Sequence, residues 1–524
     1  MRYTTLMTRR RALALLVGTA ATSAVLAASC DLSVPSVPAA APQPTPDAAG
    51  HDHSTQSPPI GGRPASPPPS RAVEHFSIAL PLLSALQPTH SDDTTDYYQL
   101  TQRVGQVEIL PGLQTTVWGY NGAFPGPLIR AKRGRTAKIR VSNQLATETV
   151  VHLHGGLTPP ESDGFPMDLI PPAGERDFSY PNDRRASTLW YHDHAMGSTG
   201  KNIYMGLAGM YVVEDDAEAA LGLPSGEFDV PLVIMNRQFT ASGELLYPDG
   251  NKFGATGDVL LVNGAPWPRM EVARRKYRFR ILNASNSDSY TLALSDGQPL
   301  AQISTEGGLL PAPLSINNLP LGMGERAEVV IDFNAYPVGS QVVLQNAGGA
   351  AAGGAAGSSE IMRFDVVRDA QDDSRVPIVL SAAQPLRETE AARSRAFTFE
   401  ETQVADGPVY AWTINGQTFD PDRVDALPDL NDVEVWTFKN VPFPGVPFQV
   451  AHPVHVHLVN FLILDRDGQP PALHESGWKD TVVVRPNEQV RVIMRFEGYR
   501  GRYLIHCHNL EHEDHAMMAR FDVA

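Results

Sequence analysis

Histidines gather in four short clusters of this sequence, and their spacing is the pattern best suited to chemistry. Ten of the 16 histidines fall in these clusters, two near residues 152–194 and two near residues 452–512. They are His152, His154, His192, His194, His452, His455, His457, His506, His508 and His512. Imidazole nitrogens bind transition metals, and every cluster contains a His-x-His pair. Four such pairs in one chain predict a metal centre rather than scattered structural histidines.

A cysteine, Cys507, stands between the two histidines of the last His-x-His pair. His512 follows five residues after it, and Met517 follows ten residues after it. Together with His452 they supply two imidazoles, one thiolate and one thioether, which is the ligand set of a blue-copper electron-transfer site. Met518 is the alternative thioether, although the spacing favours Met517. The sequence therefore predicts a copper ion that cycles between Cu(I) and Cu(II).

The backbone that positions these groups is predicted to be extended. Side chains alternate between the two faces of a β-strand, so both imidazoles of a His-x-His pair point to one side. The same alternation sends Cys507 to the face opposite its two histidine neighbours. One strand is therefore expected to present a thiolate to one metal site and two imidazoles to another, with an electron path on the order of 10 Å between them.

Short β-rich runs alternate with Gly, Pro and Asn turns from about residue 73 onward. Examples are residues 137–141, 277–282 and 433–438. The chain also contains 44 prolines and 43 glycines, which suits a turn-rich β protein better than a helical bundle. An all-β fold of sandwich or barrel domains is therefore predicted.

Asn-Gly pairs recur at intervals of 142 and 152 residues, which is the size of one β-sandwich. The pairs begin at Asn121, Asn263 and Asn415. Each is followed 20 to 25 residues later by a strand that ends in asparagine, and these residues are Asn143, Asn283 and Asn440. We therefore expect three similar domains, over residues 73–216, 225–370 and 375–524.

Residues 1–30 are predicted to be an export signal. Thr8, Arg9 and Arg10 resemble a twin-arginine signal, and an apolar run follows them. The run ends at Cys30 in a sequence similar to a lipoprotein cleavage site, so either a lipid anchor at Cys30 or ordinary cleavage nearby is expected. Residues 31–72 are rich in proline and poor in large apolar residues, which predicts a disordered tether. We therefore expect an exported protein that is located in the periplasm or the cell envelope.

Charge and cysteine content exclude several other classes of protein. The formal net charge of −16 repels nucleic acid and anionic lipid headgroups, so no nucleic-acid partner is expected. Cys30 and Cys507 are the only cysteines, so the mature chain has no intramolecular disulfide framework.

Four stretches carry a family resemblance: residues 152–156 (HLHGG), 190–194 (WYHDH), 452–457 (HPVHVH) and 506–518 (HCHNLEHEDHAMM). They resemble the copper motifs of the three-domain multicopper oxidases, and the similarity covers the chain from about residue 105 to its end. The resemblance implies three cupredoxin-like domains, which are Greek-key β-sandwiches or barrels. It also implies four copper ions, one of type 1, one of type 2 and a type 3 pair, the last three forming a cluster between the first and third domains.

The resemblance assigns each ligand by motif position. Type 1 copper would be held by His452, Cys507, His512 and Met517. Type 2 copper would be held by His152 and His455. The type 3 pair would be held by His154, His192, His194, His457, His506 and His508. Reduction of O2 to water also consumes protons in a buried site, and Asp163 and Glu513 match the acids that the family uses there.

The electron donor is less clearly marked in the sequence. WYHDHAMG resembles bacterial laccases and bilirubin oxidases, whereas GLAGMYVVEDD and GWKDTV resemble copper-efflux oxidases. Efflux oxidases tend to carry Asp and Met shortly before the first type 1 histidine, where this chain has Phe448 and Val450. A laccase-like oxidase of phenols, aromatic amines or bilirubin-like molecules is therefore favoured. The alternatives are a metallo-oxidase of Cu(I), Fe(II) or Mn(II) and, from another class, a copper-free structural relative.

Overall fold

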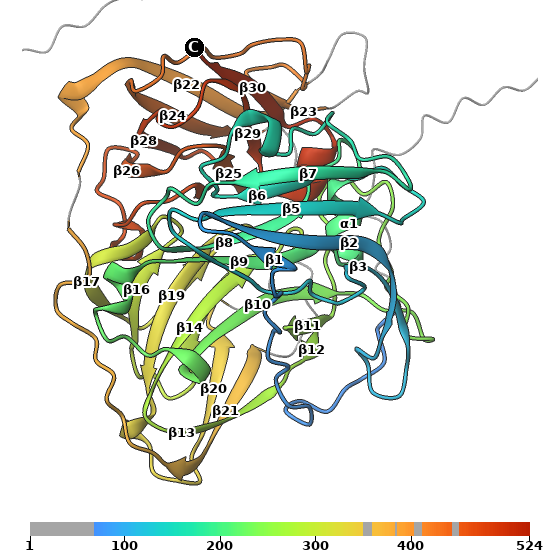
Figure 1. Ribbon diagram of the computed structural model, residues 1–524, viewed down its shortest axis with the longest axis vertical. Coiled ribbons are helices and arrows are strands. Elements are labelled where there is room, and N and C mark those ends of the chain that lie inside the picture. Colours follow the sequence, from blue (N-terminus) through green and yellow to red (C-terminus); the bar gives the residue numbers. More distant parts are fainter. Residues whose placement is uncertain (1–67, 349–358, 383–384, 403–410, 443–449) are drawn as a thin grey trace, which may run out of the picture. The chain divides into compact units, whose positions relative to one another are not determined.

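The computed structural model describes residues 68–348, 359–382, 385–402, 411–442 and 450–524. The predicted signal, Cys30, residues 31–67 and Phe448 lie outside the described residues. Strands dominate the described part and form six sheets, with a few short helices between them (Figure 1). No helix in this part is both long and apolar enough to cross a membrane.

The first pair of sheets contains the strands up to residue 214. One sheet has the order β1 (His90–Ser91), β2 (Thr95–Val107), β5 (Thr136–Asn143), β7 (Glu175–Tyr180), with β3 (Thr115–Tyr120) paired to β2. The other has the order β4 (Ile129–Lys132), β9 (Ala208–Glu214), β8 (Ser187–Asp193), β6 (Val151–His154).

The middle pair is the largest. One sheet has the order β12 (Ala265–Pro266), β11 (Val259–Val262), β10 (Asp229–Arg237), β14 (Lys276–Asn283), β19 (Arg326–Asp332), β16 (Leu300–Thr305), β17 (Gly308–Ile316). The other has the order β13 (Arg269–Arg274), β21 (Glu360–Asp369), β20 (Gln341–Asn346), β15 (Tyr290–Leu294), β18 (Leu319–Leu321).

The last pair carries the cysteine. One sheet has the order β23 (Ala411–Ile414), β22 (Ala391–Thr402), β24 (Val433–Val441), β28 (Gln489–Arg495), β26 (Phe461–Arg466). The other has the order β27 (Thr481–Val484), β25 (His452–Val456), β29 (Gly501–Cys507), β30 (Met518–Val523). The α-helices are α1 (Thr199–Met205), α2 (Asp216–Ala219) and α3 (Leu510–Asp514). The 3₁₀ helices are η1 (Pro160–Ser162), η2 (Gly226–Phe228), η3 (Phe333–Ala335), η4 (Glu388–Glu390) and η5 (Leu473–Glu475).

The Asn-Gly repeat of the sequence is also a repeat of the structure. Asn121, Asn263 and Asn415 all have positive φ, of 57°, 52° and 54°, in the left-handed region that asparagine tolerates. Each side-chain Oδ1 accepts a hydrogen bond from a strand amide at 2.8–2.9 Å, the donors being Thr101, Val233 and Thr398. The same parallel pairing recurs as well, between β2 and β5, β10 and β14, and β22 and β24.

A separate hydrophobic core fills each pair of sheets. The predicted all-β class, built from cupredoxin-like sandwiches, is confirmed. The domain boundaries stay predictions. Near the first boundary, the Ser70 amide donates to Asp258, the residue before β11, at 2.7 Å, so a hydrogen bond to the middle domain already forms within the segment predicted to be a tether.

Candidate metal centres

Eight imidazoles meet where the first and last pairs of sheets face each other. Antiparallel pairing sets His152 of β6 opposite His192 of β8, and sets His455 of β25 opposite His506 of β29. Rings from the first and last pairs of sheets then stack on each other, and the ring centroids of His154 and His455 are 3.6 Å apart. All eight side chains are at most 1% exposed. The sequence prediction that four His-x-His pairs converge is therefore realised in the geometry.

The ring nitrogens follow a common pattern of hydrogen bonds. Nδ1 of His152 lies 2.5 Å from the Asp163 carbonyl, and Nδ1 of His192 lies 2.8 Å from the Asp193 carbonyl. His455 is held in the same way by the Asp480 carbonyl at 2.8 Å. A carbonyl only accepts, so each Nδ1 carries the hydrogen and each Nε2 keeps a lone pair.

These Nε2 atoms are buried and have no hydrogen-bond partner in the described structure. Burial, reinforced by neighbouring imidazoles, lowers the pKa of His152 and His192 well below the ordinary value. The rings are therefore neutral and their lone pairs are free. Unpartnered buried nitrogens are costly unless something binds them, and convergent neutral imidazoles fit transition-metal ions.

Asp163 lies beside the histidines, as the sequence predicted. Its Oδ2 is 2.7 Å from Nδ1 of His457, so a carboxyl group from the first domain holds an imidazole of the last. The Thr158 hydroxyl also donates to Asp163 at 3.1 Å. Burial raises the pKa of Asp163 to about 8, which lets this carboxyl keep a proton near neutral pH.

Glu513 bridges two histidines that come from different domains. Its Oε1 lies 2.8 Å from Nδ1 of His194, and its Oε2 lies 3.1 Å from Nδ1 of His506. Burial alone would raise its pKa, but the two imidazoles outweigh burial and hold the pKa of Glu513 well below its usual range. Glu513 is therefore a charged acceptor that orients both rings.

Cys507 lies on the other face of β29, as strand alternation predicted. Its Sγ is 3.4 Å from Nδ1 of His452 and 3.5 Å from Nδ1 of His512. Burial raises the pKa of the Cys507 thiol, and a bound metal ion would favour its deprotonation. The side chain of Met517 is fully buried in the same core, and its carbonyl accepts from the Cys507 amide at 3.1 Å.

Trp412 of β23 covers this second site, and sequence reasoning did not find it. Its ring stacks on His512 with centroids 3.8 Å apart, and its Nε1 donates to the Lys252 carbonyl at 2.8 Å. His452 and His512, which the resemblance assigns to type 1 copper, are at most 1% exposed in the described structure. A reductant could therefore exchange electrons with these two rings only through the residues that cover them, such as Trp412.

Asp480 is a further carboxylate at the eight imidazoles that sequence reasoning missed. Its Oδ1 lies 3.1 Å from Nε2 of His154, and both of its oxygens accept from Arg326. The available signal was the charged pair Lys479-Asp480 directly before the apolar run of β27. That pair does not predict which residue Asp480 contacts, because the partner histidine is 326 residues away in the sequence.

The donor atoms fall into groups that fit copper ions. His452, Cys507 and His512 place their ligand atoms within 4.8 Å of one another, and so do His194, His457 and His506. A thiolate with imidazoles favours copper, and neutral imidazoles favour copper over magnesium or calcium. His457 also groups with His152 and His455. Distances alone therefore do not assign every ring to an ion, and the type 2 and type 3 assignments stay predictions.

Comparison with known proteins agrees with this chemistry. Three family models described as multicopper oxidase match residues 101–218, 240–357 and 389–524. A laccase of Bacillus subtilis (strain 168) is 35% identical over 86% of this chain and 99% of its own length. A bilirubin oxidase of Albifimbria verrucaria is 37% identical over 85% of this chain and 81% of its own length.

A solved structure extends the likeness to three dimensions. The laccase from Pediococcus acidilactici Pa5930 superposes with a TM-score of 0.79 at 31% identity, covering 87% of this chain and 95% of its own. The three matching family models, the relatives that align over most of the chain and the two clusters of candidate copper ligands all point to the same family. This chain belongs to the multicopper oxidase family.

Proposed function

We propose that this enzyme oxidises phenolic or other aromatic donors one electron at a time and reduces O2 to water. Four copper ions would be bound, one at Cys507 and three among the eight imidazoles. Bound copper would supply the one-electron chemistry at the first site and the reduction of O2 at the second. Each donor loses one electron, and each O2 takes up four electrons and four protons.

The observation that carries this proposal is the division of strand β29 between two sites. Cys507 contacts His452 and His512, while the preceding residue, His506, lies 3.2 Å from His457 through its Nε2. A covalent path of a few bonds therefore joins the two sites. A protein that only stored metal would need no such junction.

The carboxylates supply the proton chemistry. Asp163 holds a proton near neutral pH and contacts His457, so it is placed to deliver a proton beside the eight imidazoles. Glu513, which stays charged, orients His194 and His506. The two acids thus take different roles because their surroundings push their pKa values in opposite directions.

Two observations support an organic donor. The laccase and bilirubin oxidase relatives align over at least 85% of this chain. Val450, two residues before His452, packs against the apolar core, so no soft thioether ligand for Cu(I) stands at that position. A metallo-oxidase of Cu(I), Fe(II) or Mn(II) is the second candidate, on the efflux-oxidase motifs. A copper-free structural role is disfavoured, since every predicted ligand is present.

The N-terminal segment supports a location outside the cytoplasm. An arginine pair before an apolar run suits export, and Cys30 suits either lipid attachment or cleavage nearby. We propose a periplasmic or cell-envelope enzyme on that basis. Mass spectrometry of the mature N-terminus tests it, and a mature chain that retains residues 1–30 would rule it out.

Steady-state oxygen consumption tests the donor class. Copper-loaded protein is supplied in parallel with a phenol, an aromatic amine, bilirubin, Cu(I), Fe(II) or Mn(II). The proposal expects the highest kcat/KM for an organic donor. If one of the metal ions is the best donor and the organic compounds are not turned over, the metallo-oxidase alternative is correct.

A further inference from the structure

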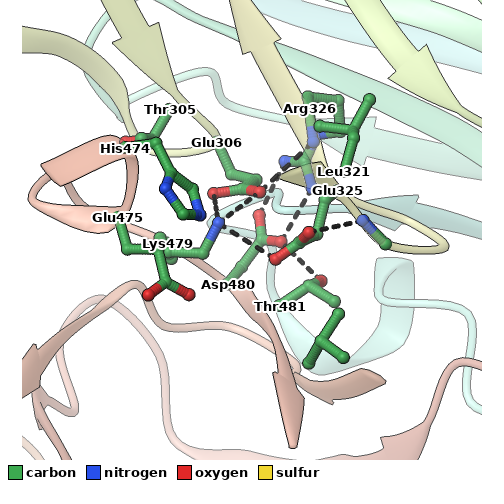
Figure 2. Close-up of polar contacts among 12 residues, drawn as sticks. Thr305, Glu306, Leu321, Glu325, Arg326, His474, Glu475, Lys479, Asp480 and Thr481 are labelled. Atoms are coloured by element: carbon green, nitrogen blue, oxygen red, sulfur yellow. Dashed lines mark hydrogen bonds and ion pairs between the residues drawn. The ribbon is translucent and has the colours of Figure 1, made fainter. Parts of the chain in front are cut away.

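A buried network of charged side chains lies between the middle and last domains, next to the eight imidazoles. Its members come from the turn between β16 and β17, from the start of β19 and the residue before it, and from the segment before β27 (Figure 2). All are at most 6% exposed. They are Glu306, Glu325, Arg326, Lys479 and Asp480. The middle domain contains none of the ten clustered histidines, but through this network Arg326 contacts Asp480, which contacts His154.

Arg326 is the centre of the network, and it touches all three domains. Its guanidinium donates to both oxygens of Asp480, at 2.7 and 2.6 Å. It also donates to the carbonyl of Thr188 in β8 at 3.0 Å and to the carbonyl of Gly324 at 3.0 Å. These bonds leave the guanidinium little freedom to rotate, so the Asp480 carboxylate is held in one orientation.

Lys479, the residue before Asp480, is clamped to the middle domain as well. Its Nζ lies 2.8 and 2.9 Å from the two oxygens of Glu306 and 3.2 Å from Glu325 (Figure 2). The Arg326 amide donates to Glu306 at 3.2 Å. Two successive residues of the last domain are thus fixed by middle-domain side chains. Buried ion pairs are weak evidence for stability by themselves, because desolvation offsets their attraction.

The network ends at His154. Its hydrogen-bonded ring nitrogen differs from that of the neighbouring histidines, which are held through Nδ1. Its Nε2, not its Nδ1, is held, 3.1 Å from Oδ1 of Asp480 and 3.0 Å from the Thr481 hydroxyl. The Thr481 hydroxyl donates to Asp480 at 2.9 Å, so both groups can accept from the ring. The hydrogen of His154 therefore sits on Nε2, and Nδ1 keeps a lone pair that has no partner in the described structure.

Gly155, directly after His154, leaves room for the pair. Its φ of +82° lies in the left-handed region, and a Cβ built there would come within 2.5 Å of Asp480 Oδ2 and 2.6 Å of Arg326 Nη2. A side chain at this position would displace the guanidinium–carboxylate contact. The first glycine of the HLHGG stretch thus makes space for charges that come from the two other domains.

We propose that Arg326 and Asp480 are positioning residues, which hold His154 with Nδ1 directed at the metal site. Through them the middle domain controls how tightly one ion of the eight-imidazole site is bound, although it donates no ligand. This inference rests on the proposed function, because it assumes that copper binds the eight imidazoles. Hydrogen-bond partners of metal-bound histidines typically contribute 10–100-fold in metal affinity.

Two substitutions break the pair with little change in shape. In Asp480→Asn the amide nitrogen can be directed at His154 and favour the wrong tautomer, and Arg326→Met removes the guanidinium. Copper per chain is measured after competition with a chelator, together with the intense visible absorption of the Cys507 site. Both variants are expected to keep that absorption and to release copper from the eight-imidazole site at about 10–100-fold lower chelator concentration. Arg326→Lys should restore part of the affinity.

Arg395→Met is the matched control. Arg395 donates to both oxygens of Glu434, at 2.6 and 2.9 Å, in a pair of the last domain that has no described contact with the histidines. It is expected to retain copper like the unmodified protein. If Asp480→Asn and Arg326→Met also retain copper with unchanged affinity, the positioning role is refuted and the proposed function stands. If the unmodified protein binds no copper, both fall.

A crystal structure of the copper-loaded, unmodified protein tests the same point without any variant. A copper ion bonded to Nδ1 of His154, with Nε2 still on Asp480, is the expected result. Copper bonded to Nε2 would overturn the inference even if the variants failed to fold.

Discussion

One peptide bond joins His506 to Cys507, yet their side chains belong to different clusters of candidate copper ligands. The Cys507 sulfur lies 3.4 Å from His452, and the His506 ring lies 3.2 Å from His457. His452 and His457 themselves belong to β25 and the residue after it, so the antiparallel pair of β25 and β29 crosses between the two sites. The proposed electron transfer between the two sites would therefore need no mobile element.

Replacing Cys507 with serine removes the thiolate and keeps the backbone. We expect Cys507→Ser to lose the intense visible absorption and donor oxidation, and to bind one copper fewer per chain, because a hydroxyl is a poor ligand for Cu(I). Absorption spectroscopy and copper analysis of the purified protein check this. A variant that keeps the absorption would exclude Cys507 as a ligand.

Met517 is expected to be a weak axial ligand rather than an essential one. Met517→Leu should keep the visible absorption and raise the reduction potential of the Cys507 site, because loss of the thioether destabilises Cu(II) relative to Cu(I). A redox titration measures the shift. Met518→Leu is the matched control, since Met518 is also buried but was only the alternative ligand. If the reduction potential shifts in Met518→Leu but not in Met517→Leu, Met518 is the axial ligand instead.

Asp163 should matter for turnover much more than for metal binding. Asp163→Asn cannot release a proton, so kcat should fall by about 100-fold or more while the copper content and visible absorption are retained. Asp177→Asn, which changes an exposed aspartate paired with Arg140, should leave kcat unchanged. Asp163→Asn with a normal kcat would contradict a role in proton delivery.

Glu306 makes folding stability depend on pH. Burial raises the pKa of Glu306 above the 4.5 of an ordinary glutamate, although the charge of Lys479 opposes the rise. The folded protein therefore keeps a proton at pH values where the unfolded chain has released it, and stability falls as the pH rises above 4.5. The loss is complete once Glu306 is ionised in the folded protein as well.

Glu306→Gln removes this titration. Thermal unfolding of the copper-loaded protein across the same pH range should show a shallower fall in Tm for Glu306→Gln than for the unmodified protein. Copper loading keeps the liganded histidines from titrating, so the difference between the two proteins isolates Glu306. Parallel curves for both proteins would show that Glu306 is ionised throughout.

The sequence alone determined what depends on local spacing. Alternation along a strand decides that Cys507 and His506 face opposite ways, and Asn-Gly pairs at a regular interval decide that three similar units follow one another. Both properties are set by the covalent chain, so the order of the residues is enough to derive them. The all-β class follows from the same short-range signals.

Tertiary structure alone decided which distant groups meet. His154 and Asp480 are 326 residues apart, and Arg326 reaches Asp480 from a domain that has no clustered histidine. The tautomer of His154 depends on that contact, as the pKa of Asp163 depends on its burial. Hydrogen bonds and desolvation act through space, whereas local spacing reports only neighbours along the chain. For this reason the sequence could name the candidate ligands but not the contact of Arg326 and Asp480 with His154.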